Sequence, residues 1–129
     1  MILQDIAHLA EFNAVRFKEE IVDDNKFTIV SYMISDPNLW KAKFGLECRG
    51  HVFNAAGKCV SMPFEKFFNY CENEFTQPTA IGNIPIRNIF EKKDGTLITP
   101  VLVNDKIVWK TKKTFYNDIS KKINALKCF

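Results

Sequence analysis

The chain has 129 residues, of which 47% are hydrophobic and 13% aromatic. This is enough apolar material for one packed core and too little for two domains, so composition excludes a disordered chain and predicts one unit over residues 1–129. The net charge of +3 fits a polyanionic partner without requiring one. The basic residues gather near the C-terminus, where only Asp118 opposes them: Lys106, Lys110, Lys112, Lys113, Lys121, Lys122 and Lys127.

The first half of the chain predicts a helix and three strands. Apolar residues within residues 2–13 recur mostly every three or four positions, as in a helix with one buried face. Residues 27–34 follow the acidic turn Asp23-Asp24-Asn25 and are rich in β-branched and aromatic side chains, which predicts a strand. Two more strand-like runs, residues 46–53 and 59–64, are joined by turn residues 54–58 and predict a β-hairpin.

The second half predicts a connector, three strands and a closing helix. Residues 73–88 are broken by prolines and a glycine and read as an irregular connector that packs through Ile81, Ile84 and Ile86. Strands are expected over residues 88–92, 96–103 and 107–112, with a turn at Asn104-Asp105, as an antiparallel meander. The spacing of Phe115, Ile119, Ile123 and Leu126 predicts an amphipathic helix capped by Thr114. The expected fold class is therefore α+β, an antiparallel sheet with N-terminal and C-terminal helices.

Cysteine usage and the termini predict an intracellular protein. No basic region precedes an apolar one at the N-terminus, and no apolar run reaches membrane-spanning length, so we expect no membrane contact and a cytoplasmic location in a cell or an infected host. The cysteines form no Cys-x-x-Cys pair and lie at no zinc-ligand spacing from His8 or His51. We expect reduced thiols and no zinc site at Cys48, Cys59, Cys71 and Cys128.

The stretch Lys92-Lys93-Asp94-Gly95-Thr96 interrupts two β-prone apolar segments. In an extended chain Lys92 and Asp94 project from one face, and Gly95 lets another molecule approach closely. A lysine becomes a nucleophile where burial or nearby cations disfavour its charged form. Two interpretations stay open at this point: a solvated surface hairpin, or a reactive lysine among phosphate-binding cations. The candidate cations are Arg49, Lys66, Lys110 and Lys112.

Four segments in a fixed order carry a family resemblance. They are Glu47-Cys48-Arg49-Gly50, then Pro63-Phe64-Glu65-Lys66-Phe67-Phe68-Asn69 with Glu72-Asn73, then Lys92-Lys93-Asp94-Gly95-Thr96, and finally Trp109-Lys110-Thr111-Lys112. Together they closely resemble the nucleotidyltransferase domain of ATP-dependent RNA ligases, nearest to the T-even phage tRNA-repair type. The likeness covers residues 27–113 well and the preceding residues only loosely. It implies the covalent nucleotidyltransferase fold that ligases share with capping enzymes.

The resemblance implies roles for individual residues. Lys92 is similar to the lysine that attacks the α-phosphate of ATP, releases pyrophosphate and keeps AMP on its amine, before RNA ends are sealed in repair. Asp94 and Gly95 complete that motif. The other implied nucleotide-binding residues are Arg49, Lys66, Phe68 and Lys112. ATP and Mg²⁺ are the implied cofactors, because charge built on the transferred phosphoryl group needs fixed cations and a metal.

The resemblance stops at the first half of the family's site. Family members continue into motifs with metal-binding glutamates and a further lysine pair, and no such sequence follows Phe129. Glu72, Glu74, Asp105 and Asp118 do not fit those motifs, so no metal ligand is assigned.

Two functions therefore stay open. The chain is either an RNA ligase module, completed by a second chain or by self-association and inactive alone, or a non-catalytic truncated relative that binds nucleotide or RNA through its basic end. Half of a sheet would expose an unpaired edge, so we expect dimerisation or poor solubility.

Overall fold

The structure, a computed structural model, describes residues 1–126 and contains two antiparallel sheets. The first has the strand order β1–β2–β3–β4, formed by Val15–Val22, Asn25–Tyr32, Arg49–Asn54 and Cys59–Ser61. The second is the hairpin of β5 (Thr99–Val103) and β6 (Lys106–Lys110). The predicted α+β class with antiparallel pairing is confirmed. The expectations for Lys127 and Cys128 lie outside the described residues.

Short helices flank the sheets. The N-terminal helix is a 3-10 helix, η1 (Leu3–Glu11), which buries Ile6 and Leu9 and confirms the predicted N-terminal helix. The remaining helices are α1 (Pro37–Lys41), η2 (Gly45–Glu47), η3 (Glu74–Thr76), α2 (Pro78–Ile81) and α3 (Asp118–Ala125). None of the helices within residues 1–126 combines the length and the apolar character needed to cross a membrane.

Two tight turns of the same type close the hairpins β1–β2 and β5–β6. Asp23 and Asp24 both have positive φ angles of 46° and 63°, and Asn104 and Asp105 have 47° and 61°. Two successive left-handed residues match the twist of paired strands, and Asn and Asp tolerate that conformation better than other side chains. The turn predicted at Asn104-Asp105 is confirmed. The prediction missed β1, whose strand begins twelve residues before the predicted strand of residues 27–34.

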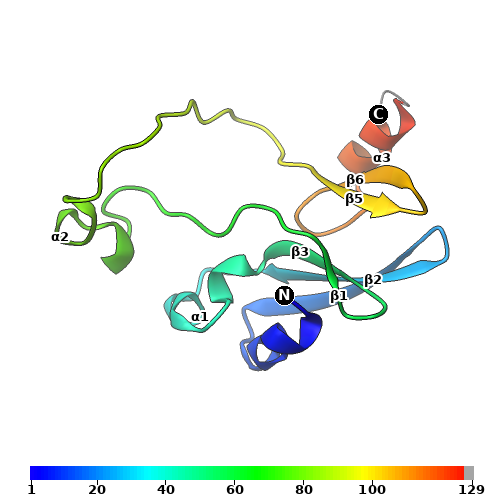
Figure 1. Cartoon of the computed structure of the whole chain (residues 1–129), viewed down its shortest axis with the longest axis horizontal. Coiled ribbons are helices and arrows are strands. Elements are labelled where there is room, and N and C mark those ends of the chain that lie inside the picture. The colour runs from blue at the N-terminus through cyan, green and yellow to red at the C-terminus, as the bar shows by residue number, and fades with distance from the viewer. Residues whose placement is uncertain (127–129) are drawn as a thin grey trace.

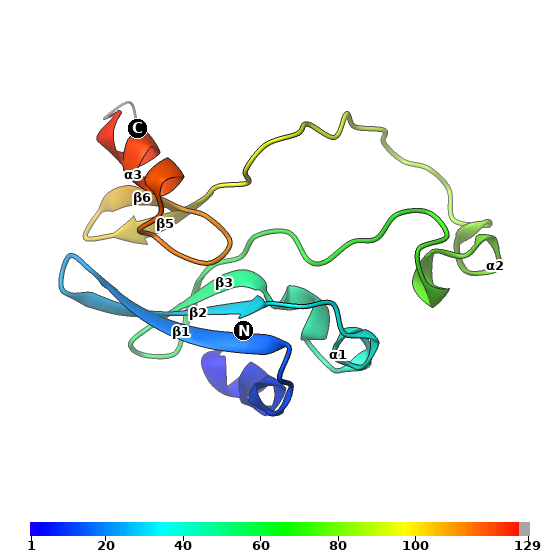
Figure 2. The same ribbon diagram turned by 180° about the vertical axis from the view of Figure 1, so that it is seen from behind.

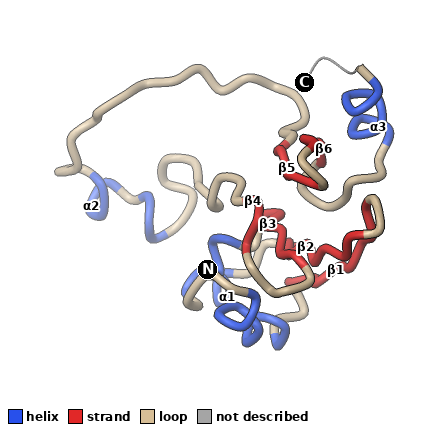
Figure 3. The backbone as a smooth tube through the Cα atoms, turned by 45° about the vertical axis from the view of Figure 1, so that its right-hand side comes forward, coloured by secondary structure: helices blue, strands red, loops and turns tan. Residues whose placement is uncertain are grey.

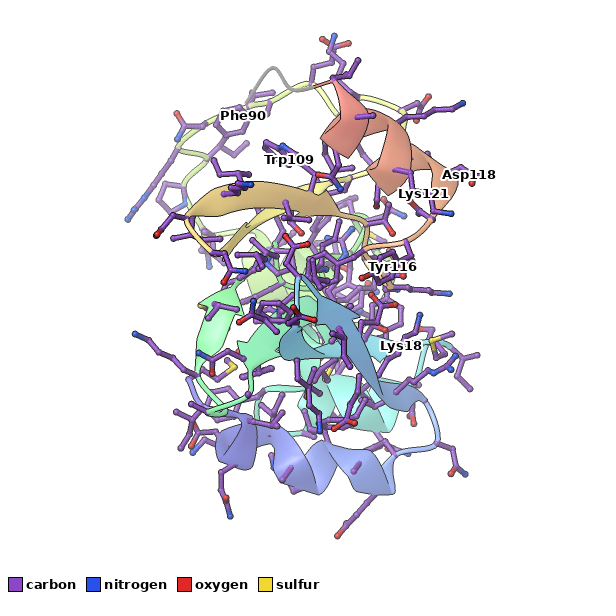
Figure 4. The ribbon with its side chains drawn as sticks, turned by 90° about the vertical axis from the view of Figure 1, so that its right-hand side faces the viewer. Lys18, Phe90, Trp109, Tyr116, Asp118 and Lys121 are labelled. Carbon is purple, nitrogen blue, oxygen red and sulfur yellow. The ribbon has the colours of Figure 1, made fainter. Side chains whose placement is uncertain are left out.

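The elements stack in layers, as Figure 4 shows, with α3 over β5–β6, the four-stranded sheet below, and η1 beneath that sheet. One buried cluster packs η1 and α1 against the sheet and includes Leu9, Leu39 and Phe53. A second joins the two sheets through Ile29 and Val52 on one side and residues of β5 and the chain after β6 on the other. Side chains that alternate along the strands supply both clusters.

Residues 62–98, which we call the arch, leave this stack after β4 and return at β5. Figures 1 and 2 show the arch reaching away from the sheets with α2 at its far end, and Figure 3 shows it mostly as loop. The predicted strand over residues 88–92 is wrong, because this stretch has no strand partner and Ile89 and Phe90 are 87% and 83% exposed. The packing predicted for the connector is also wrong for Ile84 and Ile86, which are exposed. The expected three-strand meander is therefore a two-stranded hairpin.

The C-terminal helix is confirmed with different details. Its N-cap is Asn117, whose Oδ1 accepts a hydrogen bond of 2.7 Å from the Ser120 amide, and the prediction of Thr114 as the cap is wrong. Phe115 precedes the helix and packs against Phe27 with ring centroids 5.6 Å apart. Ile119 is exposed, so the apolar spacing overstated the buried face of this helix.

Candidate functional site

Two adjoining hollows lie where the arch returns to the sheets. One, of about 440 Å³, is lined by Lys92, Asp94 and Gly95 from the arch together with Arg49 of β3. The other, of about 490 Å³, is lined by Gly95, Arg49 and Lys112. Arg49 and Gly95 belong to both. The structure thus brings five of the predicted site residues around one continuous region: Lys92, Asp94, Gly95, Arg49 and Lys112.

Gly50 explains how Arg49 comes close to Lys112. A Cβ at this glycine would lie 2.6 Å from the Lys112 carbonyl oxygen and 3.1 Å from the Lys112 Cα, which is closer than side chains and backbone can approach. Its φ of 100° is also a conformation that L side chains rarely adopt. Glycine at this position lets β3 lie against the backbone just after β6, so Arg49 and Lys112 sit on neighbouring backbone segments that are far apart in sequence.

Lys112 is held in an electropositive, half-buried setting. Its ammonium lies 3.4 Å from the centroid of the Tyr32 ring. Burial, followed by the charges of Lys113, Arg49 and Lys66, lowers the pKa of Lys112 to about 8. The contributions of these three cations to the shift indicate a positive electrostatic environment around Lys112, which favours a bound anion.

Arg49 and Lys66 are each supported by an aromatic ring of the arch. The Arg49 guanidinium lies 4.8 Å from the Phe67 centroid, and its Nη1 donates to the Glu65 carbonyl at 3.3 Å. The Lys66 ammonium lies 4.3 Å from the Phe68 centroid and donates to the Phe67 carbonyl at 2.8 Å. Cation–π contacts of this kind fix a charged group without neutralising it.

Phe68 stands apart from the lysine motif. Its ring packs against Trp40 and Phe75, with centroids 6.0 Å apart in both pairs, and it lines a separate hollow beside α1. Phe68 therefore contacts the site only indirectly, by packing against the Lys66 ammonium. Lys66 is linked to the region through its effect on Lys112.

The cations carry no neutralising partner. Among the ion pairs of residues 1–126, none involves Lys92, Arg49, Lys66 or Lys112, whereas the neighbouring Lys93 pairs with Glu91 at 2.6 Å. Unpaired Arg and Lys side chains around a hollow are suited to bind phosphate groups. Lys92 itself is exposed at the rim, with its amine accessible.

The described residues do not hold a metal by themselves. Within residues 1–126 no cluster of three His, Cys, Asp or Glu side chains is arranged to bind a metal ion. The Mg²⁺ implied by the resemblance is therefore not assigned to any of these residues.

Three buried polar residues behind the hollows were not predicted as site residues. They are Glu20, His51 and Lys110, and all three are buried. Of these, only Lys110 is among the candidate cations that the sequence indicates. Burial and the charge of Lys110 lower the pKa of His51 to about 4, so His51 is neutral at pH 7.

Comparisons with known proteins agree with this region. A protein-family model described as RNA ligase, of the T4 type, matches residues 47–127, which include every candidate cation. A curated protein named "Putative RNA ligase" from Thermovibrio ammonificans is 33% identical over 100 residues. That match takes in 76% of this chain and 26% of the relative, so the chain spans about a quarter of the relative's length.

Proposed function

The chain belongs to the T4-type RNA ligase family, and from this premise we propose that it is the nucleophile-bearing module of an ATP-dependent RNA ligase. Residues 1–129 would act as one unit of a nucleotidyltransferase domain. The observation that carries the proposal is the hollow that Lys92 shares with Arg49, beside a second hollow that contains Lys112.

The proposed reaction begins at the Lys92 amine. Its Nζ attacks the α-phosphorus of ATP, a P–N bond forms, the bond to the β-phosphate oxygen breaks, and pyrophosphate leaves while the amine loses a proton. AMP then passes to a 5′-phosphate of RNA, and a 3′-hydroxyl displaces AMP to seal the strand. Sealing of this kind would serve RNA repair inside a cell, where ATP is available.

The cations would bind the phosphates. Charge grows on the transferred phosphoryl group and on pyrophosphate, and fixed positive groups stabilise it without reorganising. Arg49 and Lys112, which line the same hollow as Gly95, would bind the phosphate groups of ATP. The positive charge of Lys66 acts on Lys112 and adds to this field. Asp94 and Gly95 would shape the approach to Lys92, and Phe68 would support Lys66.

Activity would require more polypeptide than this chain. The relative is about four times longer than the matched part, and no carboxylate cluster for Mg²⁺ occurs in residues 1–126. We propose that a second chain or a second copy completes the site. The exposed apolar side chains of the arch, Phe64, Tyr70, Ile86 and Phe90 among them, offer a surface for that contact.

The test is transfer of label from ATP. The chain is incubated with Mg²⁺ and α-labelled ATP, alone and with candidate partner proteins, and acid-stable label on the protein is measured. Lys92→Ala should abolish label, whereas the matched variant Lys93→Ala should retain it. Peptide mapping should find AMP on Lys92. AMP on the half-buried Lys112 would contradict the assignment of Lys92 as the nucleophile.

Substrate choice is tested in the same assay. Labelled GTP in place of ATP, and DNA ends in place of RNA ends, separate an RNA ligase from capping enzymes and DNA ligases, which share the lysine motif. We expect label from ATP and sealing of RNA only.

A second candidate is binding of RNA or nucleotide without chemistry. The exposed lysines after β6, Lys113, Lys121 and Lys122, favour it. In that case RNA affinity falls steeply with salt while no label ever forms. A flat salt response removes this candidate.

A further inference from the structure

Lys110 is a lysine with no exposed surface, in the layer between the two sheets. Its Nζ donates to the Thr111 carbonyl at 2.8 Å and lies 3.2 Å from the position that a Cβ of Gly50 would take. The ammonium therefore occupies the space that the missing side chain of Gly50 leaves open. Through Thr111 it holds the residue directly before Lys112.

Glu20 of β1 holds the other end of the same segment. Its Oε1 accepts from the Thr114 hydroxyl at 2.5 Å, and its Oε2 accepts from the Phe115 amide at 2.9 Å. The Asn117 side-chain amide also donates to the Thr111 hydroxyl at 2.9 Å. Residues 111–115, which we call the strap, are thus fixed at both ends while Lys112 and Lys113 between them stay free of ion pairs.

A buried lysine is a costly way to stabilise a fold. Burial lowers the pKa of Lys110 to about 8, and the carboxylate of Glu20 opposes that shift. Taking an ammonium group out of water costs free energy that an apolar side chain of similar length does not. A role other than stability accounts better for an ammonium at this position.

We propose that Lys110 is a positioning residue that fixes one end of the strap so that Lys112 faces Arg49 at the phosphate site. Glu20, which is ion-paired with Lys18 at 2.5 Å, fixes the other end. The inference rests on the proposed function only in taking the pair Lys112 and Arg49 as the phosphate site. Lys110 does not line either hollow, so it acts through Lys112.

The experiment is a double-mutant cycle with inorganic tripolyphosphate, titrated calorimetrically into the full chain at constant pH and salt. We expect Lys110→Met to weaken binding about tenfold in the wild-type background and less than about twofold in the Lys112→Ala background, because contacts that act through one another are not additive. In the matched Lys113→Ala background the loss should stay about tenfold. The melting temperature of Lys110→Met should be unchanged or raised.

Each result decides the inference. The inference is overturned if wild type and Lys110→Met bind tripolyphosphate equally well, or if Lys110→Met loses the same affinity in every background. It is also overturned if Lys110→Met loses affinity and melting temperature together. If Lys110→Met does not fold, Glu20→Gln enters the same cycle under the same criteria. Wild type that binds tripolyphosphate and takes label from ATP, with Lys110→Met unaffected, refutes only this inference. Wild type that binds no tripolyphosphate refutes the proposed function as well.

Discussion

The stacked sheets and the arch divide the candidate site between two kinds of structure. The body, residues 1–61 and 99–126, buries its apolar side chains and fixes Arg49 and Lys112 on packed strands or directly beside them. The arch carries Lys92, Lys66 and Phe68, yet Ile89 and Phe90 beside the lysine motif are almost fully exposed. The proposed phosphate-binding residues of the body are therefore preorganised, whereas the proposed nucleophile, Lys92, sits on a segment with little packing of its own.

The two regions therefore contribute differently to folding stability and to the candidate site. The body supplies the positions that a charged ligand needs, because rigid neighbours hold cations together at lower cost than free loops do. The arch carries Lys92, the proposed nucleophile, and many exposed apolar side chains. In the proposed function a partner would cover these side chains.

The largest expected effect is on the free energy of unfolding, when a large apolar side chain is truncated in the body and, for comparison, in the arch. Phe53→Ala in the body removes a side chain with no exposed surface and should lower the free energy of unfolding by about 3–5 kcal/mol. Phe90→Ala in the arch, which is 83% exposed, should change it by less than about 0.5 kcal/mol. Urea unfolding of both variants measures this. Similar losses would show that the arch packs in solution.

The next prediction compares Gly50, which lies against the Lys112 backbone, with Gly95, which has open space where a Cβ would lie. Gly50→Ala must push the Lys112 backbone aside and accept a φ of 100°, so unfolding should lose more than about 2 kcal/mol and tripolyphosphate affinity should fall with it. Gly95→Ala meets no atom within 4 Å, so only its φ of 148°, which L side chains rarely adopt, opposes the change, and we expect a smaller loss of about 1–2 kcal/mol.

Urea unfolding and calorimetry on the two glycine variants give both numbers. A Gly50→Ala protein with wild-type stability would mean that β3 does not lie against the Lys112 backbone.

A pH response should come from the body. Lys112 and Lys110 have pKa values lowered to about 8, chiefly by burial. As pH rises from 7 to 9 Lys112 loses its proton, so ATP affinity should fall roughly tenfold. Lys112→Met should remove most of this fall, measured by calorimetry across that range.

Stability should move in the opposite direction. Between about pH 8 and 9 the two lysines are deprotonated more readily in the folded chain than in the unfolded one, so stability rises with pH. Above pH 9 the raised pKa of the buried Cys48 thiol opposes this rise, so the test is confined to the lower window. Thermal melts that instead fall steadily over this window would contradict the burial of these lysines.

The smallest effect tests whether the body is one unit. The Asn104 side chain links the β5–β6 turn to the β1–β2 turn, since its Oδ1 accepts from Asn25 at 3.0 Å and its Nδ2 donates to the Asp23 carbonyl at 3.3 Å. Asn104→Gly keeps the left-handed backbone and loses both bonds, so we expect a loss of about 0.5–1 kcal/mol. The matched change Asn88→Gly in the exposed arch should have no measurable effect in the same melts.

Local patterns predicted the body better than the arch. The hairpin of residues 46–64, the turn at Asn104-Asp105 and the helix before residue 13 follow from turn chemistry and apolar periodicity, and the structure has all three. The strand predicted over residues 88–92 failed because β-prone side chains form a strand only when a neighbouring strand accepts their hydrogen bonds. Here β5 pairs with β6 from Thr99 onward and leaves Ile89 and Phe90 without a partner.

The candidate site divides in the same way. Motif order alone identified the family and pointed to Lys92, Arg49, Lys66 and Lys112, because the reaction class restricts which residue types stand beside a reactive lysine. Sequence could not show that Arg49 and Lys112 line one hollow, since their proximity depends on Gly50 lying against the backbone of Lys112.

The sequence by itself determined the family, the local turns and the residue types of the phosphate site, all of which depend on short-range chemistry. Only the tertiary structure decided which cations share a hollow and which lysine is buried. Lys110 and Lys112 are two residues apart and chemically identical. One fills the space beside Gly50 and the other faces the phosphate site, because contacts between distant strands set the surroundings of each.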